Sequence, residues 1–211
     1  MERAEGLGPY RYVQGAFPLG RDTLLLGAFP ALRRGMRVCD LGCGAGALPL
    51  LLLGREPSLR VTGIELEAAD AELARRNLAD NGLAGEIVTG DLRAATKALP
   101  AGGFDLVVSN PPWFPEGTGR SGGRARMEHA CTLDELCAAA GRLLKSGGRF
   151  ALVHRPERLA DLLEGLRRHG MEPKRLRLVQ HAHDSPPSAC LLEGARQGRP
   201  GLAVLPALIS N

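Results

Sequence analysis

The sequence predicts an α/β fold with a mostly parallel sheet that ends in an antiparallel hairpin. Between residues 36 and 170, short apolar runs rich in branched side chains alternate with longer runs of helical period, as in successive β-α units. Glycines directly follow the first apolar run, as they do where a strand turns into a helix. After Gly170, two apolar runs follow each other without a helical segment between them, which predicts a closing hairpin.

Each element is expected where its hydrophobic period begins and ends. The predicted parallel strands are 37–41, 60–65, 86–89, 104–109 and 149–154, and the hairpin strands are 173–180 and 189–195. The predicted helices are 45–54, 68–81, 92–98, 132–145 and 156–169. Residues 1–35 precede this pattern and read as a separate amino-terminal extension, whereas 36–211 form the main domain. The segment 115–130 contains four glycines and three arginines, which indicates a flexible insertion.

Charge and composition allow a polyanionic partner and argue against a membrane protein. The chain carries a net charge of +4, and residues 142–211 hold twelve basic and six acidic side chains, which suits a polyanionic partner. Of the 27 basic residues, 24 are arginine, so a biased genome composition explains the excess about as well. No apolar run approaches the roughly 20 residues that cross a bilayer, and no leader-like segment follows Met1. We therefore expect a soluble, cytoplasmic protein without a membrane partner.

The cysteines do not indicate a disulfide framework or a metal site. There are five of them, an odd number, and no Cys-x-x-Cys pair occurs, so reduced and mostly buried thiols are expected. The pair His181 and His183 has no evident third ligand. The sequence therefore predicts no bound metal.

A glycine-rich turn after the first strand indicates a nucleoside-containing cofactor. The run Asp40-Leu41-Gly42-Cys43-Gly44-Ala45-Gly46 leads from the strand into a helix. Its glycines let the backbone turn sharply and approach a ligand, and the start of the helix offers unpaired N–H groups. Glu65 closes the next strand, where a carboxylate accepts hydrogen bonds from ribose hydroxyls.

The carboxylates of Asp40 and Asp91 help to decide which nucleoside-containing cofactor binds at this turn. Gly42-x-Gly44-x-x-Ala47 also satisfies a dinucleotide fingerprint, so a nicotinamide oxidoreductase is an alternative. Asp40, however, would repel a pyrophosphate and attract the ammonium of an amino acid. Asp91, after the third strand, is a candidate contact for the adenine end of the cofactor.

A second motif, Ser109-Asn110-Pro111-Pro112-Trp113-Phe114, follows the fourth strand. Two consecutive prolines stiffen the loop, so the Asn110 side chain and the Pro111 carbonyl form two acceptors at a fixed separation. Trp113 adds a flat stacking surface. This combination suits a planar group with an exocyclic NH2, such as adenine, cytosine or a glutamine amide, although a structural turn with a core aromatic is also compatible.

With these motifs in place, the sequence resembles the class I S-adenosylmethionine-dependent methyltransferases, and among them the amino-methylating group with an Asn-Pro-Pro-aromatic motif. More narrowly it resembles the bacterial tRNA(Val) adenine-N6 methyltransferases. The supporting residues are Asp40 to Gly46, Glu65, Asp91-Leu92, Asn110 to Trp113, Gln14, Gly20 to Leu26, Ala125 to Glu128, Cys131 to Leu133 and Gly198 to Pro206. Trp113 replaces the usual tyrosine, Met127 the usual histidine, and Arg21 a small residue.

The resemblance implies a Rossmann-like class I methyltransferase fold, S-adenosylmethionine as cofactor, and an extension 1–35 that covers the cofactor site of a methyltransferase domain 36–211. It implies cofactor contacts from Asp40, Gly42, Gly44, Gly46, Glu65, Asp91, Leu92 and Asn110, and catalytic roles for Asn110, Pro111, Pro112 and Trp113.

The substrate implied by the resemblance is adenine N6 in tRNA or another structured RNA, with no obligate protein partner. Specificity is then expected from the extension, the 115–130 insertion and the basic carboxy-terminal third. Candidate RNA contacts are Phe114, Arg120, Arg124 and Arg126. The alternatives are methylation of a protein glutamine amide and a non-enzymatic RNA-binding role on the same fold.

Overall fold

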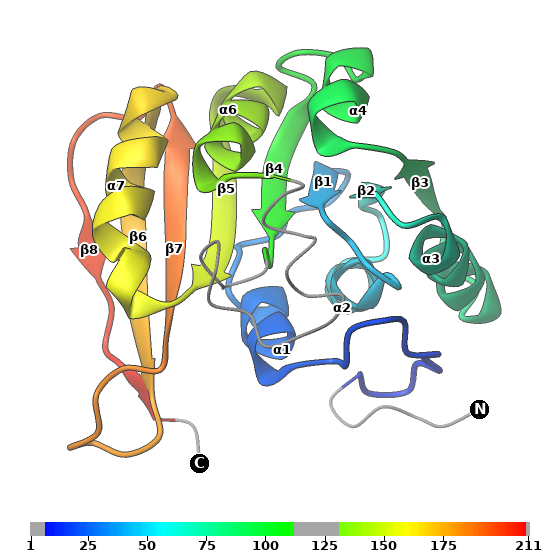
Figure 1. The fold of residues 1–211 in the computed structure, drawn as a ribbon, viewed down its shortest axis with the longest axis horizontal. Coiled ribbons are helices and arrows are strands. Elements are labelled where there is room, and N and C mark those ends of the chain that lie inside the picture. Colours follow the sequence, from blue (N-terminus) through cyan, green and yellow to red (C-terminus); the bar gives the residue numbers. More distant parts are fainter. Residues whose placement is uncertain (1–6, 112–130, 210–211) are drawn as a thin grey trace.

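A computed structural model describes residues 7–111 and 131–209. It contains one nine-stranded sheet in the order β3-β2-β1-β4-β5-β7-β6-β8, with β9 also paired to β6 (Figure 1). The strands are β1 Arg37–Leu41, β2 Arg60–Glu65, β3 Gly85–Thr89, β4 Phe104–Ser109, β5 Leu144–His154, β6 Met171–Gln180, β7 Ala189–Arg196, β8 Ala203–Val204 and β9 Leu208–Ile209.

Strand directions confirm the predicted fold class. β1 to β5 pair in parallel, β7 pairs antiparallel to both β5 and β6, and β6 therefore runs in the same direction as β5. As a result, the carboxyl ends of β1 to β6 all lie at one edge of the sheet. The bounds of β1, β2 and β4 are those predicted. The short strands β8 and β9 extend the sheet in parallel with β6 and were not predicted.

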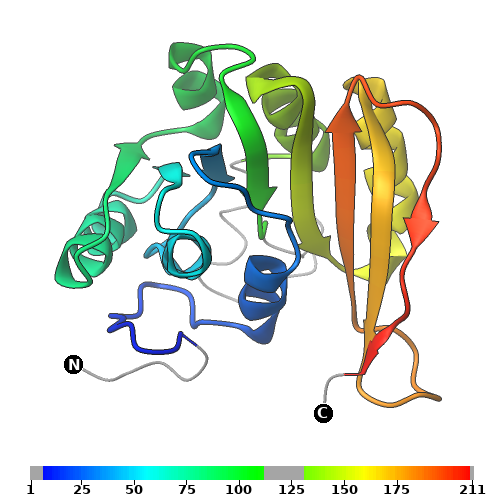
Figure 2. The same cartoon turned by 180° about the vertical axis from the view of Figure 1, so that it is seen from behind.

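Helices cover both faces of the sheet, as the front and back views show (Figures 1 and 2). One apolar cluster contains residues of the first three helices and the other contains residues of the last three. The helices are α1 Arg21–Ala28, α2 Ala47–Arg55, α3 Ala68–Asp80, α4 Leu92–Ala98, α6 Leu133–Leu143 and α7 Leu159–Arg168, and a 3-10 turn, η1 Pro156–Arg158, precedes α7.

Two predicted helices differ most from the observed ones. The helix expected over 132–145 ends at Leu143, because β5 begins at Leu144, five residues before the predicted start. Leu144 pairs with Phe104, and the register then shifts so that Arg149 pairs with Leu106. Gly147, with φ +74°, lies within this irregular stretch, and such an interruption hides a strand from a pattern search. The helix expected over 156–169 is divided into η1 and α7.

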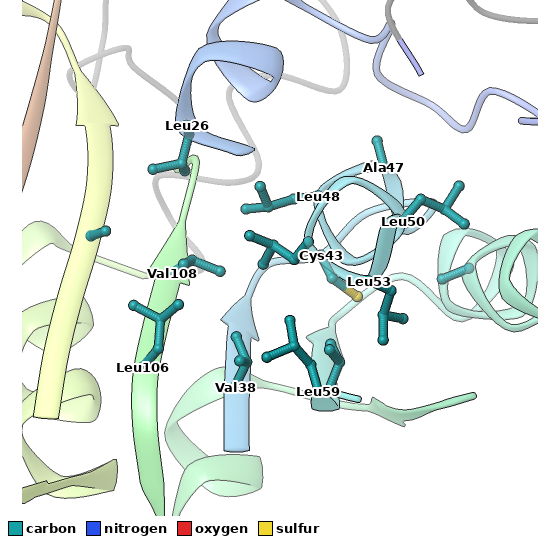
Figure 3. Close-up of a cluster of buried hydrophobic side chains, with 14 of the residues drawn as sticks. Leu26, Val38, Cys43, Ala47, Leu48, Leu50, Leu53, Leu59, Leu106 and Val108 are labelled. Atoms are coloured by element: carbon teal, nitrogen blue, oxygen red, sulfur yellow. The ribbon is translucent and has the colours of Figure 1, made fainter. Parts of the chain in front are cut away.

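The first apolar cluster packs α2 against the central strands (Figure 3). Leu50 and Leu53 of α2 belong to the same buried cluster as Val38 of β1 and Leu106 of β4, and all four are at most 1% exposed. Burial of this kind stabilises by about 25 cal/mol per Å² of apolar surface. The packing fixes α2, and with it the glycine-rich turn at its amino end.

The amino-terminal segment is bound to α3 by side chains rather than by a strand. Asn77 accepts from the backbone N–H of Val13 and donates to the carbonyls of Val13 and Ala45, at 2.8–2.9 Å. Asn81 makes the corresponding pair with Arg11. These amides satisfy the backbone of an extended segment as a neighbouring strand would. We call residues 11–16, bound along α3, the amino-terminal strap.

Further along, α1 is anchored at its carboxyl end. Arg55 of α2 donates to the carbonyls of Gly27 and Pro30, and Arg175 of β6 donates to the carbonyl of Phe29. The Arg175 guanidinium also lies 4.5 Å from the centre of the Phe29 ring, a cation–π contact. These groups fix the position of α1 over the sheet.

We predict that Asn77→Ala lowers the free energy of unfolding by about 2–4 kcal/mol, because a buried polar group without a partner costs about 1–3 kcal/mol. Asn77 is 1% exposed, so water cannot easily replace its hydrogen bonds. Urea denaturation followed by circular dichroism measures the change. Arg76→Ala, an exposed neighbour on α3, is the matched control and should stay within about 0.5 kcal/mol; equal effects of the two substitutions would contradict the prediction.

Candidate active site

A cavity of about 350 Å³ lies where β1, β2 and β4 end, beneath the amino-terminal segment. Seven of its lining residues precede β1, and the others come from the glycine-rich turn, the start of α2, the end of β2, α3, and the loop after β4. They are Tyr12, Phe17, Pro18, Leu19, Gly20, Asp22, Thr23, Asp40, Gly42, Cys43, Gly44, Ala45, Ala47, Leu48, Glu65, Asp70, Asn110 and Pro111.

The glycine-rich turn forms one wall of the cavity, and its shape requires glycine. Gly42, Gly44 and Gly46 have φ values of +81°, +53° and +85°, in the left-handed region that other residues rarely adopt. Gly42 and Gly44 line the cavity. Gly46, the N-cap of α2, does not, and a Cβ there would lie 3.1 Å from the Cβ of Ala74. Gly46 thus lets the turn pack closely against α3, and its contact with the cofactor stays a prediction.

Glu65, at the end of β2, is 2% exposed and holds the turn in place. Its carboxylate accepts from the backbone N–H of Gly44 at 2.8 Å and of Glu67 at 2.9 Å. Burial raises its pKa, against the lowering effect of these two hydrogen bonds. Because a carboxylate offers about four lone-pair sites, Glu65 retains acceptor capacity on the side of the cavity.

Asp40, at the end of β1, is the most unusual group of the cavity. It is 1% exposed, and neither of its carboxylate oxygens has a hydrogen-bond partner in the described part of the chain. Burial, and then the nearby Glu65 carboxylate, raise its pKa well above the ordinary value. Since an unpaired buried carboxylate is strongly unfavourable, this arrangement suits a ligand that brings a positively charged donor.

Two further carboxylates make the lining acidic. Asp70 of α3 accepts from the N–H of Ala16 in the strap, and Asp22 lies in the first turn of α1. The N-cap of α1 is Gly20, so Asp22 does not cap the helix, and burial raises the pKa of its carboxyl group. No lysine or arginine occurs among the described residues that line the cavity, which favours a cationic ligand.

The candidate catalytic residues begin where β4 ends. The Ser109 hydroxyl donates to the carbonyl of Leu41 at 2.7 Å and ties the ends of β4 and β1 together. Asn110 and Pro111 come next and line the cavity. The side-chain Nδ2 of Asn110 donates to Oγ1 of Thr23 at 2.9 Å. Outside the described residues lie Pro112, Trp113, Phe114, Arg120, Arg124 and Arg126.

Asp91 and Leu92, expected at the adenine end of the cofactor, do not line this cavity. Asp91 caps α4 by accepting from the N–H of Arg93 at 2.8 Å, and it also pairs with the Arg93 guanidinium at 2.6 Å. The side-chain hydrogen bond from Arg93 lowers the pKa of Asp91 to about 2. A contact of Asp91 or Leu92 with adenine stays a prediction.

The structure therefore brings together Asp40, Gly42, Gly44, Glu65 and Asn110, with Pro111 beside them. Several further residues line the cavity that the sequence did not predict as site residues. They come from segments far from the motifs in sequence, and only the tertiary fold brings them to the site. They include Tyr12, whose pKa burial raises to about 12, and also Phe17, Thr23 and Asp70.

A mostly parallel sheet with a glycine-rich turn after its first strand and an acid at the end of its second is typical of the class I methyltransferases. A family model described as "Methyltransferase small domain" matches residues 20–168. The chain belongs to this family. The cofactor that this class of fold implies is S-adenosylmethionine. The unpaired carboxylate of Asp40 fits the ammonium group of that cofactor, and Glu65 fits its ribose.

Curated relatives support the narrower resemblance. The chain is 37% identical over 158 residues to a tRNA1(Val) (adenine(37)-N6)-methyltransferase of Porphyromonas gingivalis, covering 70% of this chain. An Aeromonas hydrophila protein of the same name is 37% identical over 150 residues, covering 69% of this chain. The chain spans 62% of the length of each of these relatives.

Among solved structures, a predicted O-methyltransferase of Agrobacterium tumefaciens is similar, with a TM-score of 0.74 and 25% identity over 89% of this chain and 86% of that one. None of the described helices is long and apolar enough to cross a membrane.

We predict that Asp40→Asn raises the free energy of unfolding of the ligand-free protein at pH 7. Because the folded-state pKa of Asp40 is raised, the folded protein retains a proton that the unfolded chain loses, so stability falls as pH rises above the unfolded value of about 4. The substitution removes this loss, so the gain in stability over the wild type is expected to be larger at pH 7 than at pH 4. Urea titrations at pH 4 and 7 measure it.

Asp105→Asn provides a control of opposite sign. The Asp105 carboxylate accepts from the N–H of Arg37 and pairs with Lys145, which lowers its pKa. Its substitution is expected to reduce stability at pH 7. A ligand-free Asp40→Asn protein that is less stable than the wild type at pH 7 would contradict our interpretation of Asp40.

Proposed function

We propose that the protein transfers a methyl group from S-adenosylmethionine to the exocyclic N6 of an adenine in tRNA. The observation that carries this proposal is the position of Asn110 and Pro111, which line the same cavity as Asp40 and Glu65. Two acceptors thus lie beside a carboxylate pair suited to the cofactor. The names of the curated relatives support tRNA as the substrate, and such a substrate places the protein in the cytoplasm.

Binding of the cofactor follows from the charges of the cavity. Asp40 would accept hydrogen bonds from the ammonium group, and Glu65 would accept them from the ribose hydroxyls. When bound, S-adenosylmethionine supplies an electrophilic methyl group on a positively charged sulfur. The acidic lining stabilises this positive charge, since the low dielectric of a buried site strengthens each Coulomb interaction.

Asn110 and Pro111 would activate the amino group. The lone pair of an adenine amino nitrogen is delocalised into the ring, so the nitrogen must become more tetrahedral before it attacks a methyl carbon. The Asn110 side-chain oxygen and the Pro111 carbonyl, each accepting one amino hydrogen, favour that change. Alignment of the nitrogen with the methyl group supplies much of the remaining rate. Trp113 and Phe114 would stack on an extruded base.

The topology indicates the edge from which tRNA would approach. β4, β5 and β6 all end at the edge that holds Asn110, so the segments that follow them, including 155–158 and 181–188, lie there (Figure 1). Within the described residues after 141, many basic side chains form ion pairs with acidic residues of the protein itself. Ion pairs with acidic residues hold Lys145, Arg149, Arg158, Arg167, Arg168 and Arg175.

Because many of these side chains are ion-paired, we do not propose that the whole basic carboxy-terminal third contacts RNA. Arg167 and Arg168 end α7, next to the start of β6 and therefore at the opposite edge of the sheet. We propose that Arg120, Arg124 and Arg126, in the segment of the sequence that follows Asn110, contact the phosphates instead.

We predict that Asn110→Ala lowers kcat by about 10²- to 10³-fold, the usual effect of losing one transition-state hydrogen bond. The assay uses labelled S-adenosylmethionine and unmodified total tRNA, followed by mass spectrometry of the nucleosides. Equal amounts of methylated adenosine from both proteins would exclude the role of Asn110. No methylated adenosine from the wild type would exclude the substrate, and label in protein would favour a glutamine amide.

We also predict that Asp40→Asn weakens S-adenosylmethionine binding by roughly tenfold or more, because a hydrogen bond to a charged group contributes about 1.5–3 kcal/mol. Titration calorimetry measures the dissociation constant. Asp105→Asn, at a carboxylate that does not line the cavity, should bind the cofactor as the wild type does. Unchanged affinity of Asp40→Asn would remove the proposed ammonium contact.

A further inference from the structure

We infer that Thr23 is a positioning residue for Asn110: it binds the amide nitrogen and thereby keeps the amide oxygen available to the substrate amino group. This inference rests on the function proposed above for Asn110. It assigns a part in catalysis to α1, which lies outside the β-α units that form the core of the fold.

The contact joins two residues that are 87 positions apart in the chain. Nδ2 of Asn110 donates to Oγ1 of Thr23 at 2.9 Å, and both residues line the cavity. A side-chain amide has one acceptor atom and one donor atom. If it turned over, two N–H donors would face the amino group, and the acceptor needed for the reaction would be lost. In the arrangement observed, Nδ2 is bound to Thr23 and the oxygen is left for the amino group, and any rotation of the amide must first break this bond.

Thr23 is itself held firmly. Leu26, one turn further along α1, is fully buried, and Gly27 packs so closely on Leu51 that an added Cβ would lie 2.8 Å from its Cδ1. The bonds from Arg55 and Arg175 fix the carboxyl end of the same helix. The Thr23 hydroxyl is therefore presented by a helix that packing and hydrogen bonds hold in one place.

The backbone of Asn110 is fixed independently. Ser109, the preceding residue, is fully buried, and its hydroxyl donates to the carbonyl of Leu41. Backbone and side chain of Asn110 are thus oriented by different parts of the fold. Since a rate advantage from positioning is lost when a reacting group is displaced by about 1 Å, removal of either constraint should act mainly on the rate.

The kinetic test compares Thr23→Val with Thr23→Ser. Valine has nearly the same shape but no hydroxyl, and we expect a roughly tenfold lower kcat, equivalent to about 1.4 kcal/mol. The KM for tRNA and the affinity for S-adenosylmethionine should change less than about twofold. Serine keeps the oxygen and should recover most of the rate. Wild-type kcat in Thr23→Val, or an equal loss in Thr23→Ser, would overturn the inference.

A second measurement does not depend on the substrate. In ¹⁵N-labelled protein, the side-chain NH2 resonances of Asn110 are identified by their disappearance in Asn110→Ala. We expect them to shift in Thr23→Val and to stay near their wild-type position in Thr23→Ser. An unmoved resonance pair in Thr23→Val would overturn the inference. If the wild type fails to methylate tRNA, the proposed function fails, while these spectra still decide the role of Thr23.

Discussion

The side-chain amide of Asn77 is the interaction on which the enclosure of the cavity depends. One buried group on α3 bonds to the carbonyl of Ala45 in the glycine-rich turn and to both backbone groups of Val13 in the strap. It thus joins the wall of the cavity to the segment that lies over it. Because each of these backbone groups needs a partner once it is buried, a hydrophobic residue at this position would break both connections together.

Without a ligand, the buried carboxylates of this cavity lower the stability of the folded protein. Asp22, Asp40, Glu65 and Asp70 all line it, and the oxygens of Asp40 have no hydrogen-bond partner among the described residues. An unpaired buried carboxylate such as that of Asp40 destabilises the folded state until a cation compensates it. Part of the binding free energy of a positively charged cofactor is therefore used to stabilise the fold, so that folding and cofactor binding are thermodynamically linked.

The sequence predicts the strands of the core better than the closure of the site. The bounds of β1, β2 and β4 were predictable because parallel strands covered on both faces are continuous apolar runs, and Asp40, Glu65 and Asn110 were identifiable as polar residues at their ends. The bond between Asn110 and Thr23 connects segments 87 residues apart, so it cannot be predicted from a local sequence pattern. β8 and β9, two residues each, are too short to show a period, and the start of β5 was hidden by its irregular pairing with β4.

The reversed strand β7 has a consequence for how this fold changes during evolution. Because β7 returns the chain antiparallel, β6 runs in the same direction as β5, and the loop 181–188 between β6 and β7 emerges at the edge that holds Asn110. That loop belongs to a hairpin far along the chain from the glycine-rich turn. Its length and composition can therefore diverge without disturbing the cofactor cavity, as is common for surface loops carried on a rigid scaffold.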